Sequence, residues 1–351
     1  MPSDLETPAV VVDVSRMERN LSRMAAMAAA AGVALRPHAK THKCVEVARR
    51  QLAHGAVGLT VATLAEAELF ASGGCPSVFI AYPLWAGSGS RGVRLAALAQ
   101  LTDLRVGVDS MAAAARLAGA VPGLRVLIEV DSGQHRSGVL PDRVAALAGS
   151  CVELGLEVIG AFTHPGHAYG SPSAVGDVAE EERVALAAAG TAVAEFVDGE
   201  PLLSGGSTPT AASGLAAPLT EVRPGTYVFG DRQQMHLSPV TVDDVALVVA
   251  ARVVSAPRAG SVVLDAGSKA LSSDRPAWLA GHGLILEAPE ATIATLSEEH
   301  AVVTGLETPL RVGDLVRVVP NHVCTVVNLT SELLIVSDGV VTDRWPVRAR
   351  H

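Results

Sequence analysis

Primary amines, the side chains that can react covalently with a carbonyl group, are scarce in this chain. Of its 27 basic residues only Lys40, Lys43 and Lys269 are lysines. Lys40 stands in the segment Arg-Pro-His-Ala-Lys-Thr-His-Lys at 36–43, just after an expected strand, with a histidine two residues away on either side. Desolvation or neighbouring cations lower the pKa of such an amine and make it a nucleophile. Lys40 is therefore the first candidate for covalent chemistry, although a solvated loop lysine is the simpler interpretation of the same residue.

A glycine-rich turn further along could bind an anion. The run Gly-Gly-Ser-Thr at 205–208 follows one expected strand, and Gly225 and Thr226 follow the next. Glycines let backbone N–H groups converge on a phosphate, and the hydroxyl groups add donors. An ordinary turn between strand and helix remains the alternative. An amine and an anion site together indicate pyridoxal 5′-phosphate, whose aldehyde would react with Lys40 while its phosphate occupies the turn.

A third motif, Pro-Asn-His-Val-Cys at 320–324, could bind a metal ion. On a strand, His322 and Cys324 would share one face and could ligate the same cation. Imidazole and thiolate together suit Zn²⁺ best among the common metals. A hydrogen-bonded histidine beside a buried cysteine is the competing interpretation.

These motifs need elements that position them, and the first two thirds of the chain supply a regular alternation. Short apolar runs alternate with alanine-rich amphipathic stretches, which indicates an α/β fold with a (β/α)8 barrel, and a doubly wound open sheet as the competitor. Ser15 and Thr63, each followed by glutamate three residues later, predict capping boxes. The expected strands are 33–36, 57–62, 78–82, 104–108, 125–130, 158–163, 201–203 and 221–223.

After residue 231 the pattern changes to short strands separated by Gly, Pro and Asp turns, which predicts a mostly antiparallel β domain. We expect the barrel over 14–235 and the β domain over 236–351 together with a strand from 5–13, although its residues 9–12 could join either sheet. The expected strands of this domain are 245–255, 261–264, 315–319, 323–329, 333–336 and 340–345.

Polar segments, four of them with glycine, follow five of the barrel strands, at the end where such barrels carry their active sites. Arg136 lies in the segment after the fifth strand, and Tyr169 lies in the segment after the sixth. The five segments are 36–43, 131–138, 164–170, 204–208 and 223–227.

Composition excludes several classes of protein. The 351 residues are 49% apolar and 18% charged, which is typical of a globular chain rather than a disordered or collagen-like one. A net charge of −9 without a run of Lys or Arg argues against a nucleic-acid partner. Four scattered cysteines indicate a reduced protein, the chain lacks a membrane-length apolar run, and its acidic first residues lead us to expect no signal sequence. We therefore expect a cytoplasmic protein with no membrane partner.

Taken together, these motifs resemble those of the D-threonine aldolase / D-serine dehydratase group of pyridoxal-phosphate enzymes, whose fold is like that of alanine racemase. The resemblance extends from residue 5 into the last sixty residues. It rests on Leu-Glu-Thr-Pro-Ala at 5–9, the lysine segment at 36–43, Glu-Val-Asp-Ser-Gly at 129–133, Gly-Gly-Ser-Thr at 205–208, Pro-Gly-Thr-Tyr at 224–227 and Pro-Asn-His-Val-Cys at 320–324.

The resemblance implies a role for each matching position. Lys40 would carry the Schiff base and act as the base at Cα. Arg136 would contact the cofactor ring or its 3′-oxygen, and Tyr169 would line the phosphate or substrate side. His322 and Cys324 would bind a divalent metal, Zn²⁺ or else Mn²⁺ or Mg²⁺, that holds the β-hydroxyl of the substrate. The phosphate would be held by Gly206, Ser207, Thr208, Gly225 and Thr226.

The resemblance implies a lyase of D-amino acid metabolism, acting as a homodimer on a small D-3-hydroxy amino acid. Members with cysteine at the second metal position are typically dehydratases, and those with aspartate are aldolases. Cys324 and the segment at 164–169 therefore favour a D-serine or D-threonine dehydratase over a D-threonine aldolase. A racemase of this fold would need a tyrosine from the β domain, and 228–351 contains none. A non-enzymatic pyridoxal-phosphate-binding protein would resemble the barrel alone.

Overall fold

The computed structural model describes residues 4–350, which form two compact units. The barrel unit comprises residues 23–40 and 45–225, and the β unit comprises 4–22, 41–44 and 226–350. Helix α1 (Val14–Ala30) runs from one into the other. Among the described residues, no helix is long and apolar enough to cross a bilayer.

The barrel unit holds eight parallel strands in the order β2-β9-β8-β7-β6-β5-β4-β3. Its two outermost strands meet through a parallel bridge between His38 and Thr60, and Thr60 N donates to Pro37 O at 2.8 Å. The sheet therefore curves back on itself, which agrees with the predicted (β/α)8 barrel. The strands are β2 (Ala34–Leu35), β3 (Leu59–Val61), β4 (Ser77–Ile80), β5 (Asp103–Val108), β6 (Arg125–Glu129), β7 (Glu157–Phe162), β8 (Leu202–Gly205) and β9 (Glu221–Val222).

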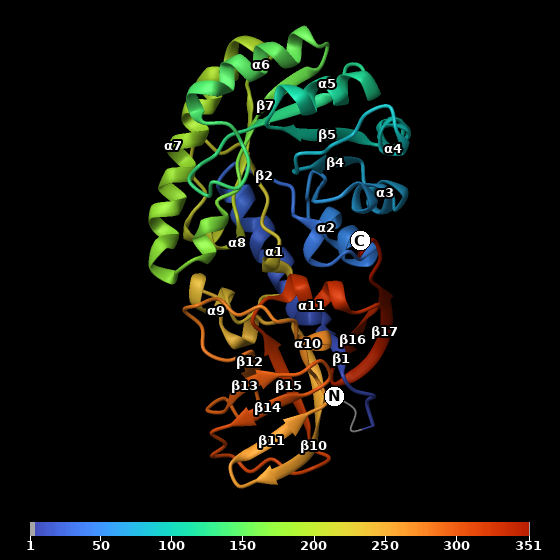
Figure 1. Ribbon diagram of the computed structural model, residues 1–351, viewed down its shortest axis with the longest axis vertical. Helices are drawn as coiled ribbons and strands as arrows, with labels where there is room; N and C mark the ends of the chain where they lie inside the picture. Colours follow the sequence, from blue (N-terminus) through green and yellow to red (C-terminus); the bar gives the residue numbers. More distant parts are fainter. Residues whose placement is uncertain (1–3, 351) are drawn as a thin grey trace. The chain divides into compact units, whose positions relative to one another are not determined.

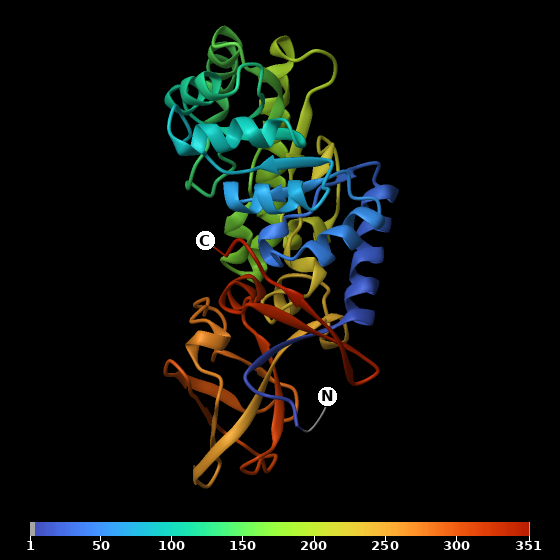
Figure 2. The same ribbon diagram turned by 90° about the vertical axis from the view of Figure 1, so that its right-hand side faces the viewer.

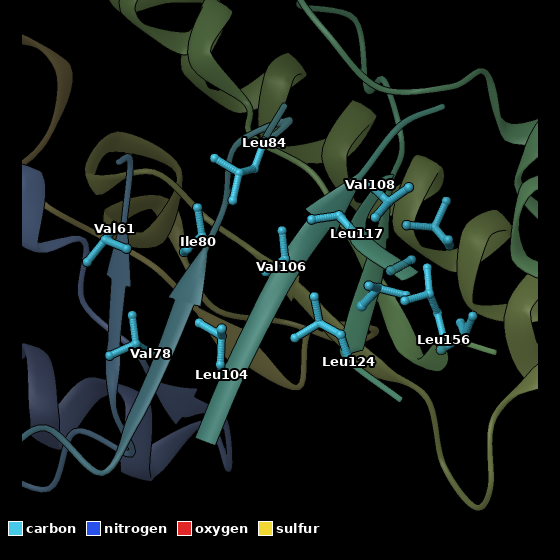
Figure 3. Packing of buried hydrophobic residues seen from close by; sticks show 14 of the residues in the cluster. Val61, Val78, Ile80, Leu84, Leu104, Val106, Val108, Leu117, Leu124 and Leu156 are labelled. Carbon is cyan, nitrogen blue, oxygen red and sulfur yellow. The ribbon is translucent and has the colours of Figure 1, made fainter. Parts of the chain in front are cut away.

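Helices between these strands cover the outer face of the sheet (Figure 1). Alternate residues of a strand point to opposite faces, so Val78 and Ile80 pack against the helices while Phe79 points into the barrel. Figure 3 shows Val78, Ile80 and Val106 on the packed face of neighbouring strands. The helices are α2 (Val45–Ala53), α3 (Leu64–Ser72), α4 (Ser90–Ala99), α5 (Met111–Ala120), α6 (Val144–Glu153), α7 (Val175–Val193) and α8 (Thr208–Ser213).

Of the two residues predicted to begin capping boxes, one caps a helix and the other does not. Thr63 caps α3 and accepts from Glu66 N at 3.1 Å, while Glu66 Oε2 accepts from Ala62 N at 2.7 Å. Helix α1, however, begins before Ser15, and the carboxylate of Asp13 accepts from Arg16 N at 2.9 Å. Aspartate is as good a cap as serine, so the helix starts at the earlier residue.

The β unit is built on a nine-stranded sheet in which β1 (Ala9–Asp13) lies antiparallel to β10 (Leu247–Arg258) and parallel to β16 (Glu332–Ser337). Figure 2 shows β1, in blue, beside the long strand β10. The first strand of the chain therefore joins the β unit rather than the barrel. The remaining strands are β11 (Ser261–Leu264), β12 (Gly283–Ile285), β13 (Thr292–Leu296), β14 (Ala301–Thr304), β15 (Leu315–Pro320) and β17 (Val340–Pro346).

The expected strand at 323–329 is wrong, because these residues form helix α11 (Val323–Leu329). Val323, Val326 and Val327 are buried at helical spacing, and β15 ends three residues earlier at Pro320. The valine-rich composition suggested a strand, but the spacing of the buried residues is that of a helix. The other two helices of the unit are α9 (Gln234–Leu237) and α10 (Ser268–Leu271).

Candidate active site

Lys40 lies at the carboxyl end of the barrel. Strand β2 is followed by a short 3-10 turn over Ala39–Thr41, which holds the half-buried Lys40. Two backbone contacts fix the strand end before it, the bridge from His38 to Thr60 and the bond from His38 N to Pro224 O at 3.0 Å. The lysine is therefore held on a rigid part of the barrel.

A cavity of about 330 Å³ in the barrel unit has Lys40 in its wall. Cations and imidazoles from the ends of several strands line it, and none of its described lining residues is an aspartate or a glutamate. Cavities lined by one sign of charge attract ligands of the opposite sign. The polar residues in the wall are His38, Lys40, Arg136, Ser137, His164 and Arg223.

His164 reports the charge of this cavity. Its enclosure, together with the nearby cations Lys40, Arg223 and Arg136, holds the pKa of His164 well below the ordinary histidine value. The ring is therefore neutral at physiological pH and can donate one hydrogen bond and accept another. His164 lies in one of the polar segments that follow the expected strands, but its residue type alone did not indicate a role.

Arg223 is a second residue that sequence analysis missed. Its guanidinium lies inside the barrel, 5.5 and 5.2 Å from the ring centres of Phe79 and Phe162, and one N–H donates to Thr163 O. Burial lowers the pKa of Arg223 to about 10, although nearby glutamates oppose this shift. The Nε atom is buried without a hydrogen-bond partner. Such an atom is suited to an acceptor that the protein itself does not provide.

The glycine-rich turn has the conformation expected of an anion site. Gly206 has φ of +79°, and a Cβ there would lie 2.4 Å from Val222 Cγ2, so only glycine fits. Ser207 caps α8, and Thr208 Oγ1 accepts from Gly225 N at 3.2 Å. The two predicted halves of the phosphate site are thus hydrogen-bonded to one another.

The N–H of Gly206 donates to the buried carboxyl group of Glu182, on α7. Burial raises the pKa of Glu182 to about 7, and the Gly206 amide partly offsets this. Glu182 accepts from Gly206 N and Thr208 Oγ1 accepts from Gly225 N, so a phosphate would have to displace these acceptors or be held by the hydroxyl groups. Thr226, the next residue in the chain, has a buried Oγ1 without a hydrogen-bond partner.

Of the two remaining barrel residues predicted for the cofactor, one lines the lysine cavity. Arg136 is exposed in the loop after β6 and contributes to the wall. Tyr169 ends the short 3-10 helix Gly166–Tyr169 after β7, is half-buried, and does not line this cavity.

His322 and Cys324 are close together in the β unit, although not on a strand. His322 is the N-cap of α11, and Cys324 lies in its first turn. The Nδ1 atom of His322 is 3.0 Å from Asp231 Oδ2, and Cys324 Sγ is 3.3 Å from Thr41 Oγ1. Burial alone would lower the pKa of His322, but Cys324 and Asp231 raise it well above its ordinary value. Cys324 and Asp231 therefore favour a positive charge at the His322 position.

Comparison with known protein families identifies both halves of the chain. Residues 12–233 match the alanine racemase N-terminal domain family, and residues 246–336 match a serine dehydratase domain family. The chain is 36% identical to a D-threo-3-hydroxyaspartate dehydratase from Delftia sp. (strain HT23), over 91% of both chains. It is 33% identical to a D-threonine aldolase from Arthrobacter sp., over 99% of this chain and 93% of that one.

The chain belongs to the family of pyridoxal-phosphate-dependent lyases that contains these two relatives. A solved structure agrees, that of a Cys-to-Ala variant of the D-threo-3-hydroxyaspartate dehydratase in its metal-free form. It superposes with a TM-score of 0.88 at 32% identity, covering 99% of this chain and 98% of that one. The family resemblance and the alanine-racemase-like fold expected from the sequence are confirmed.

The residues present fit the cofactor of the family. Pyridoxal phosphate carries a dianionic phosphate and an aldehyde, and the cavity supplies a lysine amine among cations. The partnerless Arg223 Nε and Thr226 Oγ1 atoms are donors without an acceptor inside the protein. An anionic ligand would supply such acceptors.

The His322–Cys324 pair fits a catalytic rather than a structural metal. Within residues 4–350, no group of three or more His, Cys, Asp or Glu side chains could hold a metal ion together. Structural zinc sites are closed by four protein ligands, whereas catalytic sites keep a position open for water or substrate. A pair of protein ligands would leave such positions open.

Proposed function

We propose that this chain is a D-3-hydroxy amino acid dehydratase, with D-serine and D-threonine as the first substrates to test. The observation that carries the proposal is the imidazole and thiolate pair of His322 and Cys324 at the start of α11. The similarity to a D-threo-3-hydroxyaspartate dehydratase, which has a Cys-to-Ala variant in a metal-free form, supports it. In this reaction the Cα–H and Cβ–OH bonds break, water leaves, and the enamine product hydrolyses to a 2-oxo acid and ammonia.

The barrel residues would bind the cofactor and move a proton. Lys40 would hold pyridoxal phosphate covalently through Nζ, and its amine, once released, would take the proton from Cα. Arg136 would face the ring or its 3′-oxygen, and Tyr169 would face the phosphate or substrate side. Arg223 and the neutral His164 would complete the cation-rich wall of the cavity and partly shield it from water. The phosphate would be held by Gly206, Ser207, Thr208, Gly225 and Thr226.

The β unit would supply the metal. His322 and Cys324 would hold a divalent cation, Zn²⁺ by the softness of the donors, through one nitrogen and one sulfur. When bound, pyridoxal phosphate withdraws electrons from bonds at Cα, and the metal acts as a Lewis acid on the β-oxygen. The protein itself would have to orient the β-hydroxyl and keep Cys324 deprotonated.

A D-threonine aldolase is the second candidate, because the relative with that activity is similar over 99% of this chain. An aldolase breaks Cα–Cβ instead of Cβ–O and needs almost the same residues. We also expect a homodimer that acts in the cytoplasm, as the family resemblance implies. Size-exclusion chromatography with light scattering tests the dimer.

The deciding experiment is product analysis with D-threonine on zinc-loaded enzyme. The dehydratase proposal expects 2-oxobutanoate and ammonia in equal amounts, whereas glycine and acetaldehyde would overturn it in favour of the aldolase. A Cys324→Asp variant sharpens the test, because exchanging sulfur for oxygen should raise the share of glycine. Lys269→Ala, at an exposed ion pair with Glu298 and Glu299, is the control that should leave the products unchanged.

A further inference from the structure

Asp231 is a fully buried carboxylate in the β unit, and both of its oxygens have hydrogen-bonding partners. Oδ1 accepts from Gln234 N at 2.8 Å, and Oδ2 accepts from Val323 N at 3.1 Å and lies 3.0 Å from His322 Nδ1. A buried carboxylate is costly unless it is hydrogen-bonded and has a cationic or polar partner. Of the three partners just named, Gln234 and Val323 contribute backbone N–H groups, and His322 contributes a side chain.

The contact with Asp231 determines which nitrogen of His322 is available. When the ring loses one proton to bind a metal, the carboxylate acceptor keeps the remaining proton at Nδ1, so the lone pair is on Nε2. The imidazole also interacts with Cys324, the other residue of the proposed metal pair. Asp231 therefore orients the ring with Nε2 as the nitrogen able to ligate a metal.

The backbone around Asp231 makes this arrangement rigid. Arg232 N donates to Pro320 O at 3.0 Å and Gln233 N donates to Asn321 O at 3.2 Å, so the segment is hydrogen-bonded to the end of β15. Asn321, itself buried, donates from Nδ2 to the carbonyls of Asp274 and Gly281, both at 2.9 Å. The carboxylate and the imidazole are thus held from both sides of their contact.

We propose that Asp231 is a positioning residue, which fixes the tautomer and orientation of His322 so that Nε2 binds the metal. The inference rests on the proposed metal role of His322 and Cys324. Carboxylates that receive the second N–H of a ligating histidine typically contribute 10–100-fold in metal affinity or activity.

The test compares Asp231→Asn with Asp274→Asn. Asp274 is a matched control because its carboxylate also binds at α11, but it accepts from Thr325 Oγ1, at 2.8 Å, whereas Asp231 contacts His322. Each pyridoxal-phosphate-loaded protein is stripped with EDTA, and its Zn²⁺ dissociation constant is measured by competition with a chromophoric chelator. We expect about 10–100-fold weaker zinc binding for Asp231→Asn only, with the yellow cofactor retained.

Three outcomes decide the matter. Zinc bound equally tightly by folded Asp231→Asn and the unmodified chain would overturn the positioning role. Weak zinc binding by the unmodified chain itself would instead overturn the metal part of the proposed function. If Asp231→Asn does not fold, Asp231→Glu takes its place, because it keeps the charge but displaces it. This variant should shift the zinc midpoint of turnover to higher concentration, and an unshifted midpoint would contradict the proposal.

Discussion

The lysine cavity of the barrel unit and the His322 cluster of the β unit have opposite electrostatics. In the cavity, enclosure and the cations Lys40, Arg223 and Arg136 lower the pKa of His164. In the cluster, Cys324 and Asp231 outweigh burial and raise the pKa of His322. A histidine is therefore kept neutral by cations in the cavity, whereas in the cluster Cys324 and Asp231 favour a positive charge on His322. The cavity suits an anionic ligand, and the cluster suits a cation, either a proton on His322 or a metal ion in its place.

The two regions also differ in how the chain builds them. The cavity gathers side chains from the ends of many strands, from His38 after β2 to Arg223 after β9. The two residues of the metal pair stand at the start of one helix, and Asp231 contacts His322 from a distant part of the sequence. A cavity assembled from distant segments depends on the whole barrel, whereas a local pair depends on a few backbone contacts.

The largest effect should follow from removing the amine of the cavity. Lys40→Ala should abolish the yellow cofactor colour and lower turnover by at least about 10³-fold, because both covalent attachment and proton transfer at Cα are lost. Absorbance spectra and a coupled 2-oxo acid assay measure the two effects. Lys269→Ala, in an exposed ion pair, should retain both. Colour and turnover that survive in Lys40→Ala would refute the assignment.

What could be predicted from the sequence follows the same division. Lys40, Arg136 and the His-x-Cys pair stand in short motifs, so they could be found without the fold. Asp231, Glu182 and Arg223 could not be assigned roles, because each acts through residues 24 to 91 positions away. Their only signal was their type, an ionisable residue among apolar neighbours. Strands β12, β13 and β14 were missed because their short runs lack a clear alternation of apolar and polar residues.

A pH effect on stability separates the regions further, because the barrel unit buries a carboxyl group, that of Glu182, whose pKa is raised to about 7 from its ordinary 4.5. The folded chain then keeps a proton that the unfolded chain releases above pH 4.5. Its contribution to the free energy of unfolding is complete below about pH 4.5 and is lost as the pH rises to about 7. The loss amounts to about 3 kcal/mol.

Urea unfolding at several pH values between 4.5 and 7.5 measures this loss. Glu182→Gln should be less sensitive to pH by about 3 kcal/mol over that interval, since it cannot titrate. Glu180→Gln, at an exposed ion pair on the same helix, should behave like the unmodified chain. Identical pH slopes for Glu182→Gln and the unmodified chain would show that Glu182 is already charged in the folded state.

Removing the thiolate of the β unit should have a somewhat smaller effect. Cys324→Ala should lower turnover by about 100-fold while the cofactor colour remains, because a Lewis acid contributes several kcal/mol to such a step. EDTA should cause the same loss in the unmodified chain, and added Zn²⁺ should reverse it. Cys151→Ala, at a buried thiol in α6 away from both regions, is the control. Turnover unaffected by EDTA would exclude a metal role for the pair.

The smallest effect tests the glycine-rich turn, and two glycines allow a matched comparison. Gly206 and Gly199 both have positive φ, +79° and +91°, so alanine should cost each of them about 1 kcal/mol of stability. Only at Gly206 would the new Cβ also meet a side chain, Val222 Cγ2 at 2.4 Å, whereas Gly199 has no atom within 4 Å. Gly206→Ala should therefore cost about 1 kcal/mol more in urea unfolding and also weaken cofactor binding. Equal losses of stability and equal cofactor affinity in the two variants would mean that the turn tolerates the added methyl group and does not require glycine for close packing.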